Sequence, residues 1–128
     1  MRNDELILRV IPKPARNGAL GFALIPAGRQ RRGRYATVYA VGVAGLASRF
    51  KTPNAVLLGC TIAHELGHLL LGKNSHTKRG IMRASWTAWE VERIAAGDLG
   101  FTAEQRKRIA RGWSTRNAPR DDAIARAD

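Results

Sequence analysis

Three short apolar runs in the first part of the chain predict β-strands. Residues 6–11 and 20–25 each form a run that is followed by a proline, and the polar, basic residues 27–34 predict a loop or hairpin tip. In residues 35–43, larger side chains alternate with small ones, which is the period of a half-buried strand. Residues 43–50 fit either the end of this strand or a short helix.

A longer helical pattern follows these runs. From Asn54, apolar residues and histidines recur at spacings of three and four for about 18 residues, which predicts one long helix that Gly72 ends. Thr52 is expected to cap the start of this helix. Pro53 is expected at the first helical position, where its missing N–H costs nothing.

Two shorter helices are predicted beyond the long one. The first runs from residue 85 or 86 to about residue 96 and is followed by Gly97, and the second begins with Thr102 as its cap and reaches residue 112 or 113. Residues 118–128 are predicted to be a frayed tail. Strands first and helices second, in a chain of 128 residues, predict a single α+β domain over residues 1–128: a small N-terminal sheet followed by the long helix, a loop and two C-terminal helices.

The segment His64-Glu65-Leu66-Gly67-His68 has the pattern HExxH and lies within the predicted long helix. Four residues make about one helical turn, so both imidazoles project from one face and can share a metal ion. Glu65 points beside that face and can reach a water on the metal, from which it would take a proton as general base. The helix is otherwise apolar, and burying these groups without a bound partner is costly. These residues therefore predict a zinc site with hydrolytic chemistry.

A catalytic zinc ion takes three protein ligands and leaves a position for water. His76 is the third histidine of the chain, and a glycine turn at Gly72 would bring it back toward the metal-binding face. Glu90 or Glu92 on the following helix is the alternative third ligand, and Asp98 is a remoter one. We favour His76, because Trp89 and Ile94 are expected to face inward on that helix and Glu90 cannot share a face with Trp89. Trp86 and Trp113 are likewise expected to be packing residues.

This run of residues resembles the signature of the metzincin clan of zinc peptidases. That signature is HExxH, two residues, glycine, two residues and a third histidine, followed by a tight turn that contains a methionine beneath the metal. Here Gly72 and His76 stand in these positions, with three residues rather than two before the glycine and three after it, and Gly80-Ile81-Met82 looks like the Met-turn. The stretch HELGHLLLGKNSH…GIM also resembles small uncharacterised bacterial proteins.

The resemblance implies a minimal metzincin-like or zincin-like fold and a zinc metallopeptidase that hydrolyses peptide bonds in a peptide or protein substrate. It implies His64, His68 and His76 as metal ligands, Glu65 as the catalytic residue and Met82 as the floor of the site. It also suggests that residues 19–23 form a sheet edge to which an extended substrate could pair, although an ordinary core strand fits them equally well.

The charge distribution suggests a second kind of partner. The chain has 22 Lys and Arg against 10 Asp and Glu, a formal net charge of +12. Nine of these cations and no acidic residue lie between Leu6 and His64. Such a positive field gives weak, non-specific attraction to nucleic acid or acidic partners. The alternative to a peptidase is therefore a basic nucleic-acid-binding protein with a structural or vestigial zinc site, and a peptidase recruited to DNA would combine the two.

The single cysteine and the N-terminal region give expectations about disulfides and cellular location. Cys60 is the only cysteine, which excludes an intrachain disulfide and a cysteine-based zinc site, and it is expected to be a small buried apolar residue. No secretory signal and no membrane span are expected from the N-terminal region, so the chain as given is predicted to be cytoplasmic; a missing leader would make it a secreted protein.

Overall fold

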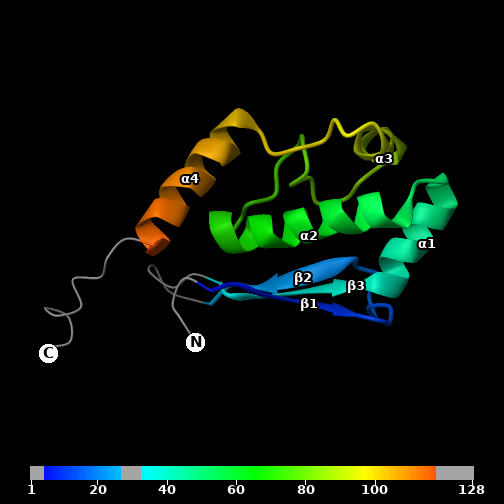
Figure 1. Cartoon of the computed structure of the whole chain (residues 1–128), viewed down its shortest axis with the longest axis horizontal. Helices are drawn as coiled ribbons and strands as arrows, with labels where there is room; N and C mark the ends of the chain where they lie inside the picture. The colour runs from blue at the N-terminus through cyan, green and yellow to red at the C-terminus, as the bar shows by residue number, and fades with distance from the viewer. Residues whose placement is uncertain (1–4, 27–32, 118–128) are drawn as a thin grey trace, which may run out of the picture.

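A long helix lying on a small mixed sheet forms the centre of the structure (Figure 1). The computed structural model describes residues 5–26 and 33–117; the predicted tail and most of the predicted basic loop lie outside these residues. The elements are β1 (Ile7–Ile11), β2 (Gly21–Leu24), β3 (Tyr35–Tyr39), α1 (Ala40–Phe50), α2 (Asn54–Leu71), α3 (Ala88–Ala95) and α4 (Ala103–Asn117). The predicted α+β class, with a small sheet followed by helices, is confirmed.

The sheet has the order β1-β3-β2, with β1 parallel and β2 antiparallel to the central strand β3. Small residues in β2 and β3 lie beneath α2: Gly21 pairs with Val38, and Ala23 pairs with Ala36. They let the helix approach the backbone of the sheet closely. Among the described strands β2 pairs with β3 alone, so its other side is an edge of the sheet.

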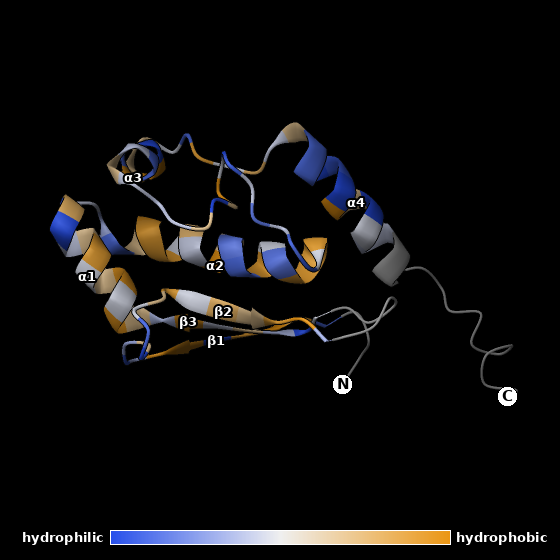
Figure 2. Ribbon diagram, turned by 180° about the vertical axis from the view of Figure 1, so that it is seen from behind, coloured by the Kyte–Doolittle hydropathy of each residue, from blue (hydrophilic) through white to orange (hydrophobic). Residues whose placement is uncertain are grey.

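The core lies between α2, the sheet and the helices around it. One buried cluster joins Val38 of the sheet to Val43, Leu57 and Ile94 of α1, α2 and α3, and a second forms around Ile81 and Met82. In α2, hydrophobic residues are interrupted by a hydrophilic stretch in the C-terminal half, where the HExxH segment lies (Figure 2). The polar groups of the motif are therefore carried on the most central helix.

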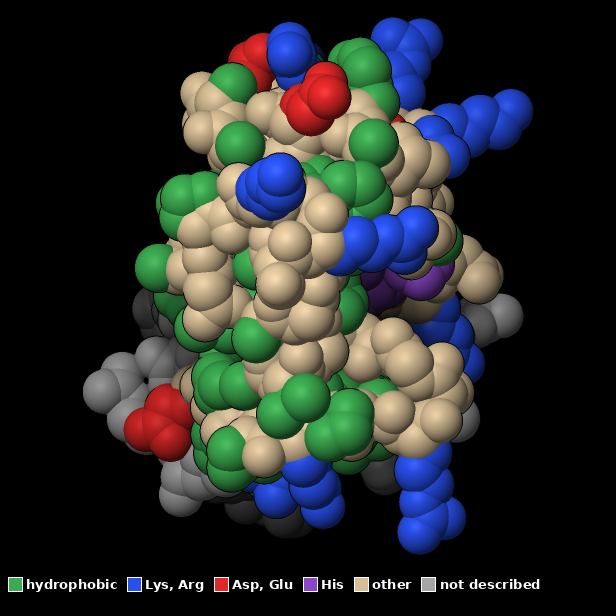
Figure 3. All heavy atoms as spheres, turned by 90° about the vertical axis from the view of Figure 1, so that its right-hand side faces the viewer, with side chains coloured by type: hydrophobic (Ala, Val, Ile, Leu, Met, Phe, Trp, Pro, Cys, Tyr) green, Lys and Arg blue, Asp and Glu red, His purple; other side chains and the backbone are tan. Residues whose placement is uncertain are grey.

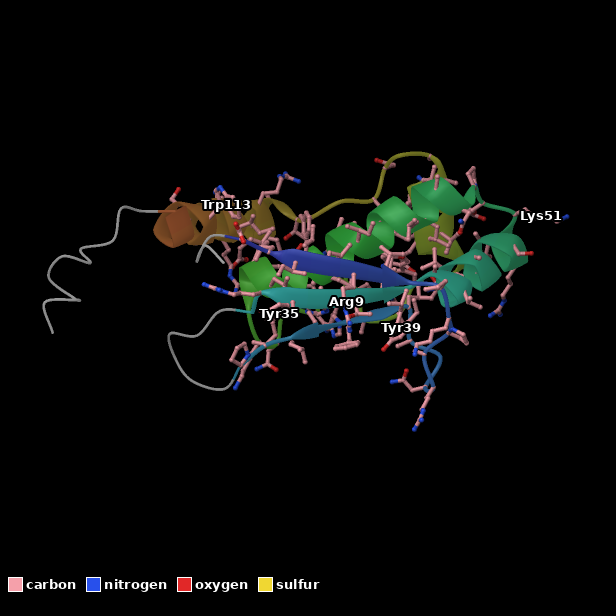
Figure 4. All side chains as sticks on the ribbon, turned by 60° about the horizontal axis from the view of Figure 1, so that its bottom comes forward. Arg9, Tyr35, Tyr39, Lys51 and Trp113 are labelled. Atoms are coloured by element: carbon pink, nitrogen blue, oxygen red, sulfur yellow. The ribbon has the colours of Figure 1, made fainter. Side chains whose placement is uncertain are left out.

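The opposite face of the sheet is lined by Tyr35 and Tyr39 of β3 and by Arg9 of β1 (Figure 4). None of the helices in the described part of the chain lies on this face (Figure 1). The ring of Tyr39 lies 6.1 Å from that of Phe22 on β2, between centroids. Two tyrosines and one arginine therefore lie on the face of the sheet that no described helix covers (Figure 1 and Figure 4).

Three local predictions are corrected by the structure. The third strand ends at Tyr39, because the chain from Ala40 onward is helical and residues 43–50 belong to α1. Pro53, not Thr52, is the N-cap of α2, since the carbonyl of Pro53 accepts the first helical hydrogen bond from Leu57. The Thr52 hydroxyl instead points back to the carbonyl of Phe50, at 3.4 Å.

The expected inward position of Trp89 is also wrong. Its side chain is 59% exposed, and the Arg93 guanidinium lies 5.7 Å from the ring centroid. Val91 and Ile94 face the core instead. Helix α3 begins at Ala88 with Thr87 as its cap, later than predicted. Trp113 is likewise 44% exposed.

Helix α2 is long and apolar enough to cross a membrane, by length and composition alone. Central helices of globular proteins meet the same criterion, and α2 packs against β2, β3 and the three other helices. The expected absence of a membrane span and the cytoplasmic location stay predictions.

Candidate metal centre

The structure brings the three histidines of the chain together beside α2. The ring centroids of His64 and His68 lie 4.8 Å apart, and His76 lies 5.4 Å from the first and 4.6 Å from the second. One nitrogen from each ring can be chosen so that all three lie within 4.8 Å of one another. These three residues could hold a metal ion.

Hydrogen bonds occupy the Nδ1 atoms of both motif histidines. His64 Nδ1 lies 2.6 Å from the carbonyl oxygen of Ile81, an acceptor, so Nδ1 carries the hydrogen and Nε2 has a free lone pair. His68 Nδ1 lies 2.7 Å from Ser75 Oγ, a hydroxyl that can accept or donate. When Ser75 accepts, the Nε2 atom of His68 also has a lone pair available to a metal.

These two Nε2 atoms face one another at 3.2 Å. One tautomer of His68 makes this contact an N–H···N hydrogen bond, and the other leaves a lone pair on each nitrogen. Two nitrogens bound to the same tetrahedral zinc ion at 2.0–2.1 Å would lie about 3.3 Å apart. The spacing is therefore compatible with two ligands of one metal ion.

His76 reaches the cluster through two turns that follow α2. Gly72 has φ +85° and Asn74 has φ +56°, a conformation that glycine and asparagine adopt more readily than other residues. The turn at Gly72 was expected, whereas the one at Asn74 was not.

A tight turn below the cluster contains Met82. The turn is closed by a hydrogen bond from the Arg83 N–H to the Gly80 carbonyl, and Met82 is fully buried. The Met82 sulfur packs against Gly67 of the HExxH segment, where a side chain would lie 2.5 Å from it. Met82 therefore lies against the helix that carries the histidines, as a Met-turn residue would.

Glu65 is buried between α2 and the edge strand β2. Its side chain is 5% exposed and lies against Gly21, where an added Cβ would be 2.9 Å from the carboxylate. Among the described residues its Oε1 has no hydrogen-bond partner. Burial raises the pKa of Glu65 to about 7, so this carboxylate can exchange a proton near neutral pH.

The surroundings of His64 and His68 favour the neutral form of both rings. Burial, together with the neighbouring histidines His64 and His76, lowers the pKa of His68 to about 4. Burial also lowers the pKa of His64, against the opposing effect of its hydrogen bond to Ile81. Neutral imidazole is the form that binds metal.

The cluster opens into a cleft of about 590 Å³. Residues of β2 and the segment before it line one side, and Arg83 to Trp86 line the other. The Trp86 ring lies edge-on to His64, 5.8 Å between centroids, and its Nε1–H donates to the Ile81 carbonyl at 3.3 Å. In the space-filling view the histidines lie in this hollow, with Lys and Arg side chains around it (Figure 3).

The alternative third ligands lie elsewhere. The Glu90 carboxylate accepts hydrogen bonds from the backbone N–H and the hydroxyl of Thr87, at 2.7 and 2.5 Å, and so caps α3. Glu92 is exposed, and Asp98 lies 3.5 Å from Arg93. Cys60 is half-buried against both core clusters rather than with the histidines, and burial raises the pKa of its thiol.

The chain matches no family model, no curated protein and no solved structure. The resemblance to the metzincin signature therefore depends on the motif residues alone, and the function has to be argued from the geometry of the site.

Sequence reasoning missed the groups that orient the ligands. Ser75 and the Ile81 carbonyl hold the two motif histidines, and both lie in the loop that follows α2. A serine next to the candidate ligand His76 was a signal that could have been used. A backbone carbonyl leaves no signal in a sequence.

Proposed function

We propose that this protein is a zinc-dependent peptidase with a metzincin-like site. In it His64, His68 and His76 hold the metal, and Glu65 is the general base. The observation that carries the proposal is that three imidazoles share one open cleft with a buried carboxylate, of which Oε1 has no hydrogen-bond partner among the described residues. A purely structural zinc site explains the histidines but gives Glu65 no role, and burying a charged group without full compensation is costly.

The donor set favours zinc. Imidazole nitrogens suit zinc, copper and nickel, and three protein ligands with a position left open are typical of catalytic zinc. Zinc bound there would polarise a peptide carbonyl and make a water more acidic. Glu65 is the residue next to the cluster that can accept that proton and pass it to the leaving amine.

The edge of β2 supports a peptide as substrate. It borders the cleft that contains Glu65 and pairs with no other described strand on that side. An extended peptide could add to this edge by backbone hydrogen bonds, which hold a chain with little demand on its sequence. The peptide bond would then lie alongside the histidines.

The metal is tested by zinc analysis of the purified protein. We expect close to one zinc ion per chain, which is lost in His64→Ala and His68→Ala and strongly reduced in His76→Ala. Glu92→Gln, which changes an exposed acid outside the cleft, is the control and should retain zinc. Full zinc content in all three histidine variants would refute the site.

The chemistry is tested separately with Glu65→Gln, which keeps the shape of the side chain and removes the base. Zinc should stay bound, while hydrolysis of a casein-like substrate should fall by about 100- to 10,000-fold. A variant as active as the parent would exclude Glu65 as the base.

A further inference from the structure

Arg83 lies next to the candidate metal centre and has no part in the chemistry proposed for it. It follows Met82 directly and lines the same cleft as His64 and Glu65. Trp86, three residues further along this segment, contacts the ring of His64. A group bound by Arg83 would therefore lie within the length of a short peptide from the histidines.

The Arg83 guanidinium is held in place before anything binds. Its Nε donates to the carbonyl of Ser85 at 2.9 Å, and its Nη1 lies 3.6 Å from the Glu90 carboxylate. Glu90 is itself 4% exposed and fixed by the two hydrogen bonds from Thr87. A charged donor that is already oriented loses little conformational entropy when it binds a ligand.

The Arg83 guanidinium still has N–H donors that could bind a ligand. Guanidinium has five N–H donors, and the contacts above involve only Nε and Nη1. The side chain is 40% exposed and lines this cleft as well as a second hollow that contains Glu90, so donors remain open to a ligand. The 3.6 Å separation from Glu90 is that of an ion pair rather than a hydrogen bond, so the N–H groups of the guanidinium are not used up by this contact.

Two arginines and one acid are the charged residues other than histidine that line the cleft in the described part of the chain. Arg49 of α1 lines it together with Arg83, and the acid is Glu65. On the face that shows the histidines, Lys and Arg side chains border the hollow, while Asp and Glu side chains lie away from it (Figure 3). A negatively charged group is thus attracted into the cleft, and a positive one is repelled.

We propose that Arg83 binds a carboxylate of the substrate and makes the site selective for peptides that carry one close to the bond that is cut. This rests on the peptidase function proposed above. A carboxylate matches the planar fork of guanidinium, which can bind it through two parallel hydrogen bonds. The carboxylate is either the side chain of Asp or Glu or the C-terminus of the substrate, and the two sources are distinguished by experiment.

Three otherwise identical peptides separate these sources: one with a central Glu and an amidated C-terminus, one with Gln in its place, and the Gln peptide with a free C-terminus. The zinc-loaded parent should cleave one or both of the acidic peptides at least about tenfold faster, in kcat/KM, than the neutral amide. Arg83→Gln should remove this preference. Arg83→Lys should restore part of it, because it keeps the charge and loses the fork.

Arg79→Gln is the matched control, since it removes the same charge from an exposed position that does not line this cleft. It should keep the preference of the parent. Equal cleavage of the three peptides by the parent, or an equal loss of preference in Arg79→Gln and Arg83→Gln, overturns the assignment and leaves the peptidase standing.

A binding measurement decides the matter independently of hydrolysis. N-acetylglutamate α-amide and its glutamine counterpart are titrated into the zinc-loaded protein, with the Trp86 indole N–H followed by NMR. A shift with the glutamate compound alone, which disappears in Arg83→Gln and persists in Arg79→Gln, supports the carboxylate site even if no peptide is cleaved. Absence of any Arg83-dependent shift overturns it, whereas failure of the peptidase proposal is read from the absence of cleavage alone.

Discussion

Gly67 and Met82 touch so closely that any side chain at position 67 would have to displace Met82. A Cβ atom on Gly67 would lie 2.5 Å from the Met82 sulfur and 2.9 Å from a ring carbon of Phe101. The glycine between Glu65 and His68 is therefore required by packing. It lets α2 rest directly on the methionine turn.

Gly67→Ala is expected to destabilise the protein by about 1–3 kcal/mol, because the added methyl group overpacks a closed interface. Urea unfolding of both proteins measures the change. Gly59→Ala is the control on the same helix, where an added Cβ meets nothing within 4 Å. It should stabilise the protein by about 0.5–1 kcal/mol, since alanine is the better helix former. Similar effects of the two substitutions would contradict the packing argument.

Ser75→Ala should weaken zinc binding by about 10- to 100-fold without removing a ligand. The Ser75 hydroxyl lies 2.7 Å from His68 Nδ1 and orients that ring, and partners of this kind usually have effects of this size on metal affinity. Competition with a zinc chelator of known affinity gives the change. Ser48→Ala, which changes an exposed serine of α1 that does not line the cleft, should leave the affinity unchanged. An unchanged affinity in Ser75→Ala would mean that the hydroxyl does not orient His68.

The metal-free protein should show a pH dependence that comes from Glu65. Its pKa of about 7 lies above the ordinary value of 4.5, so the folded form keeps a proton that the unfolded chain releases between these values. The stability from this group is fully present below about pH 4.5 and is lost as the pH rises through 7.

Glu65→Gln abolishes this loss, so the stability of the variant minus that of the parent should increase from pH 5 to pH 8 by up to about 3 kcal/mol. Chemical denaturation in a chelating buffer at both values measures it. The lowered pKa values of His64 and His68 act alike in both proteins and cancel in the difference. A difference that does not change with pH would show that burial does not perturb the carboxylate.

The basic first half should give weak DNA binding that salt removes. We expect the affinity to disappear between about 50 and 200 mM salt, as release of counterions requires. Arg9→Gln on the open face of the sheet should lower the slope of log K against log salt by about one, whereas Lys107→Gln on α4 should leave it unchanged. Tight, sequence-selective binding at high salt would instead favour the nucleic-acid-binding alternative.

The relative placement of the two motif histidines could be predicted from the sequence because it is decided within one helix. The period of α2 places His64 and His68 on one side without knowledge of the rest of the chain. Gly72 marked both the end of the helix and the return of the chain toward His76. The class of the fold followed in the same way from the order of short apolar runs and helical patterns.

The sequence-based predictions that were wrong concern features that depend on contacts between elements. Trp89 was expected to be buried because it is large and apolar, but the phase of α3 is set by its start at Thr87, and Glu90 turns inward to cap that start. The predicted strand at Tyr35 was too long, because the alternation of side chains continues past the residue where the chain turns into α1. Arg83 belongs to no recognisable motif, and only the fold shows that it lines the cleft.

The loop that carries His76 is supported from behind by the last helix. Gln105 of α4 donates to Thr77 at 3.0 Å, and Arg108 donates to the last carbonyl of α2, that of Leu71, at 3.2 Å. The Ile81 N–H bonds to Gly100, in the connection that leads to α4. Order in α4 would therefore strengthen the binding of a metal ion through His76. By linkage, binding of that ion would stabilise α4 by the same free energy and protect it against local opening and hydrogen exchange.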